Sequence, residues 1–110
     1  MNKKELEERL IKFAVCITEI VLSISDTKAA NHLGGQLMRS GTSPALNYGE
    51  AQSAESTKDF IHKLRVVLKE LRETNICLQI IHRSKQFFNE EDILKAVQES
   101  DELIAILLPA

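Results

Sequence analysis

Apolar residues recur along this chain at alternating steps of three and four residues, the spacing that gathers side chains on one face of an α-helix. Such runs cover residues 3–24, 28–54, 56–85 and 91–107, and short polar segments separate them. Four amphipathic helices joined by short connections are typical of an antiparallel, up-and-down bundle. The pattern therefore predicts an all-α four-helix bundle, with residues 1–110 forming a single domain.

Pro44 falls inside the second of these runs and indicates a kink. A proline lacks the amide hydrogen of a helical bond, and its ring clashes with the carbonyl four residues earlier, here Ser40. Gly41 and the neighbouring hydroxyls can relieve this strain, and proline is favoured as the first residue of a helix. We therefore expect an interruption near Pro44, either a break or a kink, and Pro44 can serve as the first residue of a restarted helix.

The first and last predicted helices carry more apolar side chains than one bundle face can bury. The first has a second apolar set beside its main stripe, and the last ends in an unbroken apolar run over residues 104–108. The second set fits either a wide core face or a subunit interface. An exposed patch of this size is unusual on a monomer. We therefore expect a homo-oligomer and assign its interface to five residues: Ile11, Val15, Leu22, Ile106 and Leu107.

The composition is that of a helical domain, with 44% hydrophobic residues, 27% charged residues and few aromatics. Scarce glycine, proline and aromatic residues argue against a sheet of short strands. Cys16 and Cys77 match no metal-binding or redox motif, so we expect them to be buried free thiols. No apolar run approaches the roughly 20 residues that span a bilayer, and no signal peptide begins the chain. We expect a soluble, cytoplasmic protein without membrane contact.

The net charge of −2 conceals two oppositely charged blocks. Residues 56–85 hold seven basic and three acidic side chains, whereas residues 89–102 hold six acidic side chains and one lysine. The two blocks either face each other within the fold or leave a basic surface free. Steps of four and three residues place five of the cationic or titratable side chains in one stripe on the third predicted helix: Lys58, His62, Arg65, Lys69 and Arg72.

This basic stripe is the candidate nucleic-acid-binding site, because phosphate contacts supply most non-specific affinity for nucleic acids. No aromatic side chains interleave with it to stack bases. A solvated face with local ion pairs, such as Lys69 with Glu73, is the alternative and is favoured for a monomer. Repetition of the stripe around an oligomeric ring would multiply its electrostatic field.

A second polar set begins inside the second predicted helix, where serine, threonine and asparagine are normally disfavoured. It comprises four residues at steps of four, four and three, and two glutamates of the next helix that could pair with the arginine: Arg39, Ser43, Asn47, Glu50, Glu70 and Glu73. The set fits either a buried polar network or a surface that contacts a ligand or subunit. We favour the network, because buried polar groups in a bundle need partners.

Residue patterns typical of enzymes are missing from the sequence. A di-iron bundle needs Glu-x-x-His on two helices and two further glutamates, and only Asp59-x-x-His62 comes near. The sequence contains no phosphate loop, nucleophile elbow or Cys/His pair. We therefore expect a non-catalytic protein without a cofactor, a metal or a small-molecule substrate.

Residues 36–74 carry polar side chains at fixed offsets: Gln36-Leu37-x-Arg39-Ser40-Gly41-Thr42-Ser43, Asn47, Glu50-Ala51-Gln52, Ser56, Lys58-Asp59-Phe60, Lys69-Glu70 and Glu73-Thr74. Together they resemble the bacterial four helix bundle protein family. That family includes proteins encoded in the intervening sequences of 23S ribosomal RNA. It is related to the accessory subunits of diversity-generating retroelements.

The resemblance implies an up-and-down bundle that assembles into a ring-like homo-oligomer, typically a pentamer. In the retroelement branch, the ring presents a basic surface to a reverse transcriptase and to nucleic acid. This chain departs from the family by Ala51 in place of a frequent glycine, by lacking a large aromatic near Cys77, and by lacking the strongly basic charge of the retroelement subunits. We expect a homo-oligomeric scaffold or adaptor that binds RNA, DNA or a nucleic-acid enzyme such as a reverse transcriptase. A purely structural assembly with no nucleic-acid role is the alternative.

Overall fold

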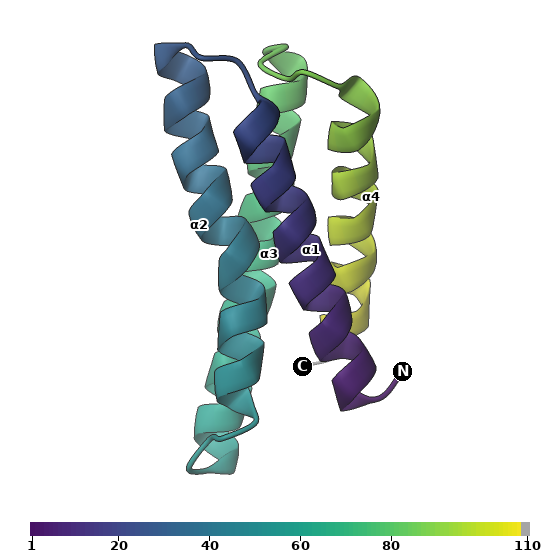
Figure 1. The fold of residues 1–110 in the computed structure, drawn as a ribbon. Helices are drawn as coiled ribbons and strands as arrows, with labels where there is room; N and C mark the ends of the chain where they lie inside the picture. Colours follow the sequence, from purple (N-terminus) through teal and green to yellow (C-terminus); the bar gives the residue numbers. More distant parts are fainter. Residues whose placement is uncertain (109–110) are drawn as a thin grey trace.

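The computed structural model describes residues 1–108, and this part of the chain folds into four α-helices (Figure 1). They are α1 (Lys3–Ser23), α2 (Lys28–Ala51), α3 (Thr57–Arg83) and α4 (Glu90–Leu107). Residues 1–108 contain no β-strand. The all-α four-helix bundle is confirmed, and the predicted helix ends agree with the observed ones to within a few residues. No helix in the described range is long and apolar enough to span a membrane.

The four helices pack in a closed order around one core. In Figure 1, each helix runs in the opposite direction to the one before it. α2 packs on both α1 and α3, α4 packs on α3, and a thinner contact between α4 and α1 closes the bundle. The hairpin of α2 and α3 reaches beyond the N-terminal end of α1 and the C-terminal end of α4 (Figure 1). The first half of α3 is therefore the least covered part of the bundle.

Each helix begins at a side-chain cap that satisfies an otherwise unpaired amide of the first turn. The capping oxygen accepts a hydrogen bond from the backbone amide three residues on, and the capping residues are Asn2, Thr27, Ser56 and Asn89. Three acidic residues occupy the first turn of α4, where the helix dipole favours negative charge. Polar segments between the apolar runs thus fix where the helices start.

In α1, α2 and α3 the core is formed by the apolar stripes that the sequence pattern identifies, including Leu10, Leu37 and Leu71, all 0% exposed. In α4 the predicted core face is wrong in part: Leu103 is buried, whereas Leu94 and Leu108, which we expected in the core, are 48% and 53% exposed.

Leu107 is also part of this core, with 5% of its surface exposed. Its assignment to a subunit interface is therefore wrong. Leu107 follows Leu103 by four residues, so both side chains point inward from the same face of α4.

The other four residues assigned to the interface lie outside the core. Ile11 is 42% exposed, Val15 51%, Leu22 82% and Ile106 38%. A wide core face therefore does not account for the second apolar set of the first helix. These side chains remain at the surface of a single copy.

α2 runs without a break from Lys28 to Ala51, with Pro44 inside it. The predicted break near Pro44 is therefore wrong, while a kink, a change in the direction of the helix axis, stays a prediction. A proline inside a helix costs about 3 kcal/mol locally. Pro44 and Ser40 are both fully buried, and Thr42 donates a hydrogen bond to the Met38 carbonyl at 2.7 Å. Packing and side-chain bonds around the proline hold the helix together.

Gly41 lets α2 approach α1 closely. A Cβ atom at this position would lie 2.6 Å from Cγ2 and 2.9 Å from Cγ1 of Ile17. Ile17 is β-branched and fully buried, so its side chain has little freedom to move away. The absence of a side chain at Gly41 therefore sets the spacing of these two helices.

We expect Gly41→Ala to lower the free energy of unfolding by about 1–3 kcal/mol, the usual cost of overpacking a core. Gly35→Ala is the matched control, because nothing lies within 4 Å of a Cβ atom there. The control should raise stability by about 0.5–1 kcal/mol, since alanine is the better helix former. Urea unfolding at one fixed protein concentration measures both changes. A Gly41→Ala variant at least as stable as the control would contradict the close contact.

Candidate nucleic-acid interface

The structure places the five residues of the predicted basic stripe on one exposed face of α3. They extend from Lys58 to Arg72, about 21 Å at 1.5 Å per residue. Within residues 1–108, the ion pair of Lys69 with Glu70, at 4.0 Å, is the only salt bridge that any of the five makes. The stripe is therefore a continuous surface with most of its positive charge uncompensated. Its role in binding stays a prediction.

Three carboxylates near the stripe are held by other cations. Arg39 of α2 donates to the Glu70 carboxylate at 2.9 Å and also bonds to Glu73. Glu50, near the end of α2, pairs with Lys63 at 3.1 Å. These carboxylates point toward α2 or lie between α2 and α3, so they leave the outer face of α3 basic.

The acidic block of α4 is also largely engaged elsewhere. Arg9 of α1 forms a bidentate pair with Glu99, with both distances 2.8 Å, and contacts Glu102 at 2.9 Å. Among the described residues, the contact of His82 Nε2 with the Glu90 carboxylate, at 2.8 Å, is the one side-chain contact between a basic or titratable group and an acid that joins the two blocks. It is an ion pair only when His82 is protonated. The suggestion that the blocks neutralise each other across the fold is therefore not supported by their ion pairs.

The predicted polar network is divided into three separate groups. Arg39 comes together with Glu70 and Glu73, as one of the predicted pairings requires. Asn47 instead donates to the carbonyl and the hydroxyl of Ser43, at 3.0 and 2.8 Å, within α2. Glu50 pairs with Lys63 and does not reach Arg39. The first group joins two helices, whereas the second is local to one helix.

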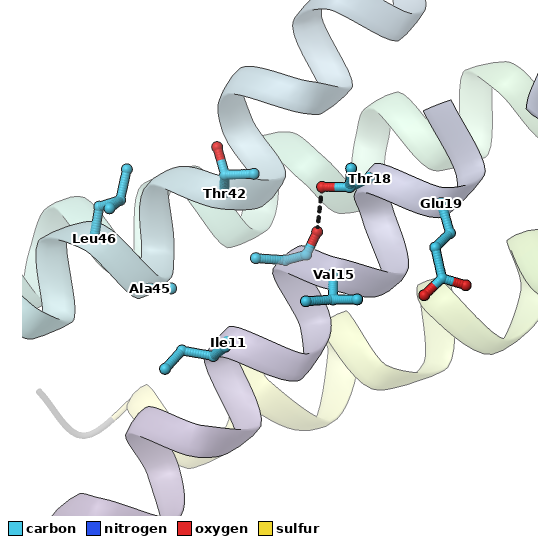
Figure 2. A pocket seen from close by; sticks show the side chains of 8 residues that line it. Ile11, Val15, Thr18, Glu19, Thr42, Ala45 and Leu46 are labelled. Atoms are coloured by element: carbon cyan, nitrogen blue, oxygen red, sulfur yellow. Dashed lines mark hydrogen bonds between the residues drawn. The ribbon is translucent and has the colours of Figure 1, made fainter. Parts of the chain in front are cut away.

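Sequence reasoning missed an apolar groove between α1 and α2, shown in Figure 2. Its volume is about 370 Å³. Ile11 and Val15 extend into it from α1, while Ala45 and Leu46 face it from α2 (Figure 2). Leu46 is 66% exposed. The available signal was that Leu46 lies next to the buried face of α2. Predicting a groove between two helices, however, also requires knowing how the helices are rotated relative to each other.

Sequence reasoning also missed two exposed isoleucines on the second half of α3. Ile76 is 57% and Ile80 47% exposed, and both line a groove of about 500 Å³ between α2 and α3. The apolar stripe of the predicted helix skips both positions, which was a usable signal. Residues 1–108 contain no group of three or more His, Cys, Asp or Glu side chains placed to hold a metal ion.

The Arg39 pairing gives a testable dependence of stability on pH. The hydrogen bond from Arg39 lowers the pKa of Glu73 below its ordinary value of 4.5. Because this pKa is depressed in the folded state, the ionised carboxylate stabilises the fold above pH 4.5, and that stability is lost as the pH falls further. We therefore expect Glu73→Gln to lose less stability than the natural chain on acidification.

Urea unfolding of both proteins at neutral pH and at pH values below 4.5 measures the difference. Arg39→Gln is the companion variant, and it should flatten the Glu73 contribution in the same way because it removes the bonded guanidinium. Identical pH profiles for the natural chain and Glu73→Gln would show that the pairing does not shift this carboxylate.

Comparison with known proteins identifies relatives of this four-helix bundle. The family model described as 23S rRNA-intervening sequence protein matches residues 3–108. No curated protein matches the chain. A solved structure of a protein of unknown function from the S23 ribosomal protein family of Bacteroides thetaiotaomicron is 30% identical. The two superpose with a TM-score of 0.86, covering 94% of this chain and 95% of the other. The chain therefore belongs to the 23S rRNA-intervening sequence protein family.

Proposed function

We propose that this chain is a non-catalytic, homo-oligomeric scaffold of the cytoplasm that binds nucleic acid, directly or together with a nucleic-acid enzyme such as a reverse transcriptase. The observation that carries the proposal is the exposed basic stripe of α3, Lys58 to Arg72, with most of its charge uncompensated. A row of cations of this kind suits the phosphate backbone, which is recognised without base contacts.

The distribution of acidic residues indicates which side of the bundle would contact nucleic acid. Glu99 and Glu102 lie on the side of the bundle formed by α1 and α4, where they pair with Arg9. Residues 89–102 hold six acidic side chains against one lysine, so this side should repel nucleic acid while the stripe of α3 attracts it. A chain with a net charge of −2 can therefore still present one cationic face.

Self-association is the second part of the proposal. Ile11, Val15, Leu22 and Ile106 are exposed apolar residues of the single copy, and burying them against another copy removes apolar surface from water. Repeating the subunit also repeats the basic stripe, so an oligomer offers several stripes to one nucleic acid. A ring of five copies is the form that the family resemblance suggests.

The stripe predicts salt-dependent binding of structured RNA and duplex DNA. Neutralising it with Lys58→Gln, Arg65→Gln, Lys69→Gln and Arg72→Gln together should abolish binding or weaken it at least roughly tenfold. For DNA, the slope of log affinity against log salt should become shallower by up to about four, since each lost phosphate contact removes about 0.9. Filter binding over a series of salt concentrations measures both effects.

The matched control makes the same change of charge away from the stripe, with Lys3→Gln, Lys4→Gln, Lys28→Gln and Lys95→Gln. This variant should keep most of the affinity and most of the salt slope. Equal losses in the two variants would indicate a response to net charge alone. Absence of binding by the natural chain at low salt would leave the purely structural assembly as its function.

The proposal also predicts a mass well above the 12.4 kDa of one chain. Size exclusion coupled to light scattering at micromolar concentration should give about five times that mass if the ring forms. A dimer would keep the argument from exposed apolar surface and contradict the ring. A mass near 12.4 kDa would contradict self-association altogether.

A further inference from the structure

Two apolar surfaces of the bundle lie on different pairs of helices. The first is the groove between α1 and α2, with Ile11, Val15 and Leu46 as its walls. Ala14 and Ala45 also line it, and their small side chains leave room for an inserted side chain. The second surface is an apolar strip on α3, formed by Ile76 and Ile80. Ile76 and Ile80 line the groove between α2 and α3 and are still about half exposed, so both can contact another molecule.

Charged residues flank each of these surfaces with opposite sign. On α1, Glu8 and Glu19 stand before and after Ile11 and Val15 on the same helix face. On α3, Arg72 and Arg83 stand before and after Ile76 and Ile80. Within residues 1–108, none of these four charged side chains makes a salt bridge, and all four are exposed.

The spacing of the flanking charges is the same on the two helices. Glu8 and Glu19 are eleven residues apart, as are Arg72 and Arg83, which corresponds to about 16 Å along an α-helix. A helix carrying the strip can therefore meet the groove with both arginines opposite both glutamates.

We propose that copies of this chain associate head to tail, with the α3 strip of one copy seated in the α1–α2 groove of the next. Ile76 and Ile80 fill the groove between Val15 and Leu46, while Arg72 and Arg83 pair with Glu8 and Glu19. This inference rests on the self-association in the proposed function and names the surfaces that perform it.

The charges also argue against contacts between identical surfaces. A groove against a groove would bring Glu8 and Glu19 of two copies together, and a strip against a strip would do the same with Arg72 and Arg83. Like charges in an interface cost affinity and suppress wrong pairings. Because the two surfaces differ, the first contact leaves the groove of one copy and the strip of the other free, so the assembly grows until it closes.

Two variants that each block one surface test this arrangement. Val15→Glu places a charge in the groove, and Ile76→Glu places one in the strip. Both positions are about half exposed, so the fold should persist, as circular dichroism can verify. Each variant alone should be a monomer of about 12.4 kDa by light scattering. An equimolar mixture should form a 1:1 dimer, because the intact strip of Val15→Glu fits the intact groove of Ile76→Glu.

Native mass spectrometry with one isotopically labelled variant identifies the 1:1 species. Leu94→Glu is the matched control, since Leu94 is 48% exposed on α4 and belongs to neither surface. It should keep the mass of the natural assembly. If the natural chain is oligomeric but the mixture stays monomeric, or either variant alone keeps the natural mass, the head-to-tail contact is wrong while self-association stands. A monomeric natural chain would overturn both.

Discussion

The salt bridge of Arg39 with the buried carboxylate of Glu70 fixes how α3 sits against α2, and the other surfaces of the molecule follow from that rotation. Glu70 is 6% exposed, so its charge needs a partner, and Arg39 supplies it at 2.9 Å. Because Glu70 points toward α2 and Leu71 lies in the core, Lys69 and Arg72 lie on the solvent-exposed face of α3. A different rotation of α3 would bury cations or expose core leucines. The basic stripe is thus a consequence of packing as well as of sequence.

Most of the fold was predictable because the relevant signals are local. Helix periodicity, capping residues and the scarcity of strand formers are all properties of short segments. The errors arise where tertiary packing decides. At Pro44, packing against buried neighbours keeps α2 continuous, although a proline inside a helix costs about 3 kcal/mol locally. In the run over residues 104–108 every residue is apolar, so the pattern does not show which side chains point inward. Only the burial of Leu103 shows that Leu107, four residues later, does so.

The candidate site shows the same difference between local signals, which the sequence reveals, and contacts between helices, which it does not. The basic stripe lies on one helix, so spacing alone was sufficient to collect its five residues. Contacts between helices were harder, because a sequence does not state the axial register of its helices. The partners of Arg39 included Glu70 and Glu73 but not Glu50, which is held by Lys63. The Arg9 pairing with Glu99 and Glu102 was missed for this reason. The α1–α2 groove required the rotation of both helices at once.

The two proposals together divide α3 into halves with different tasks. Residues 58–69 lie on the part of the α2–α3 hairpin that projects toward the open end of the bundle (Figure 1). Residues 72–83 form the apolar strip and its flanking arginines. Arg72 belongs to both surfaces. When Arg72 pairs with Glu8 or Glu19 of a neighbouring copy, the stripe loses this one cation and the rest of the stripe stays free. Assembly and phosphate binding are therefore compatible on one helix, because each uses its own length of α3.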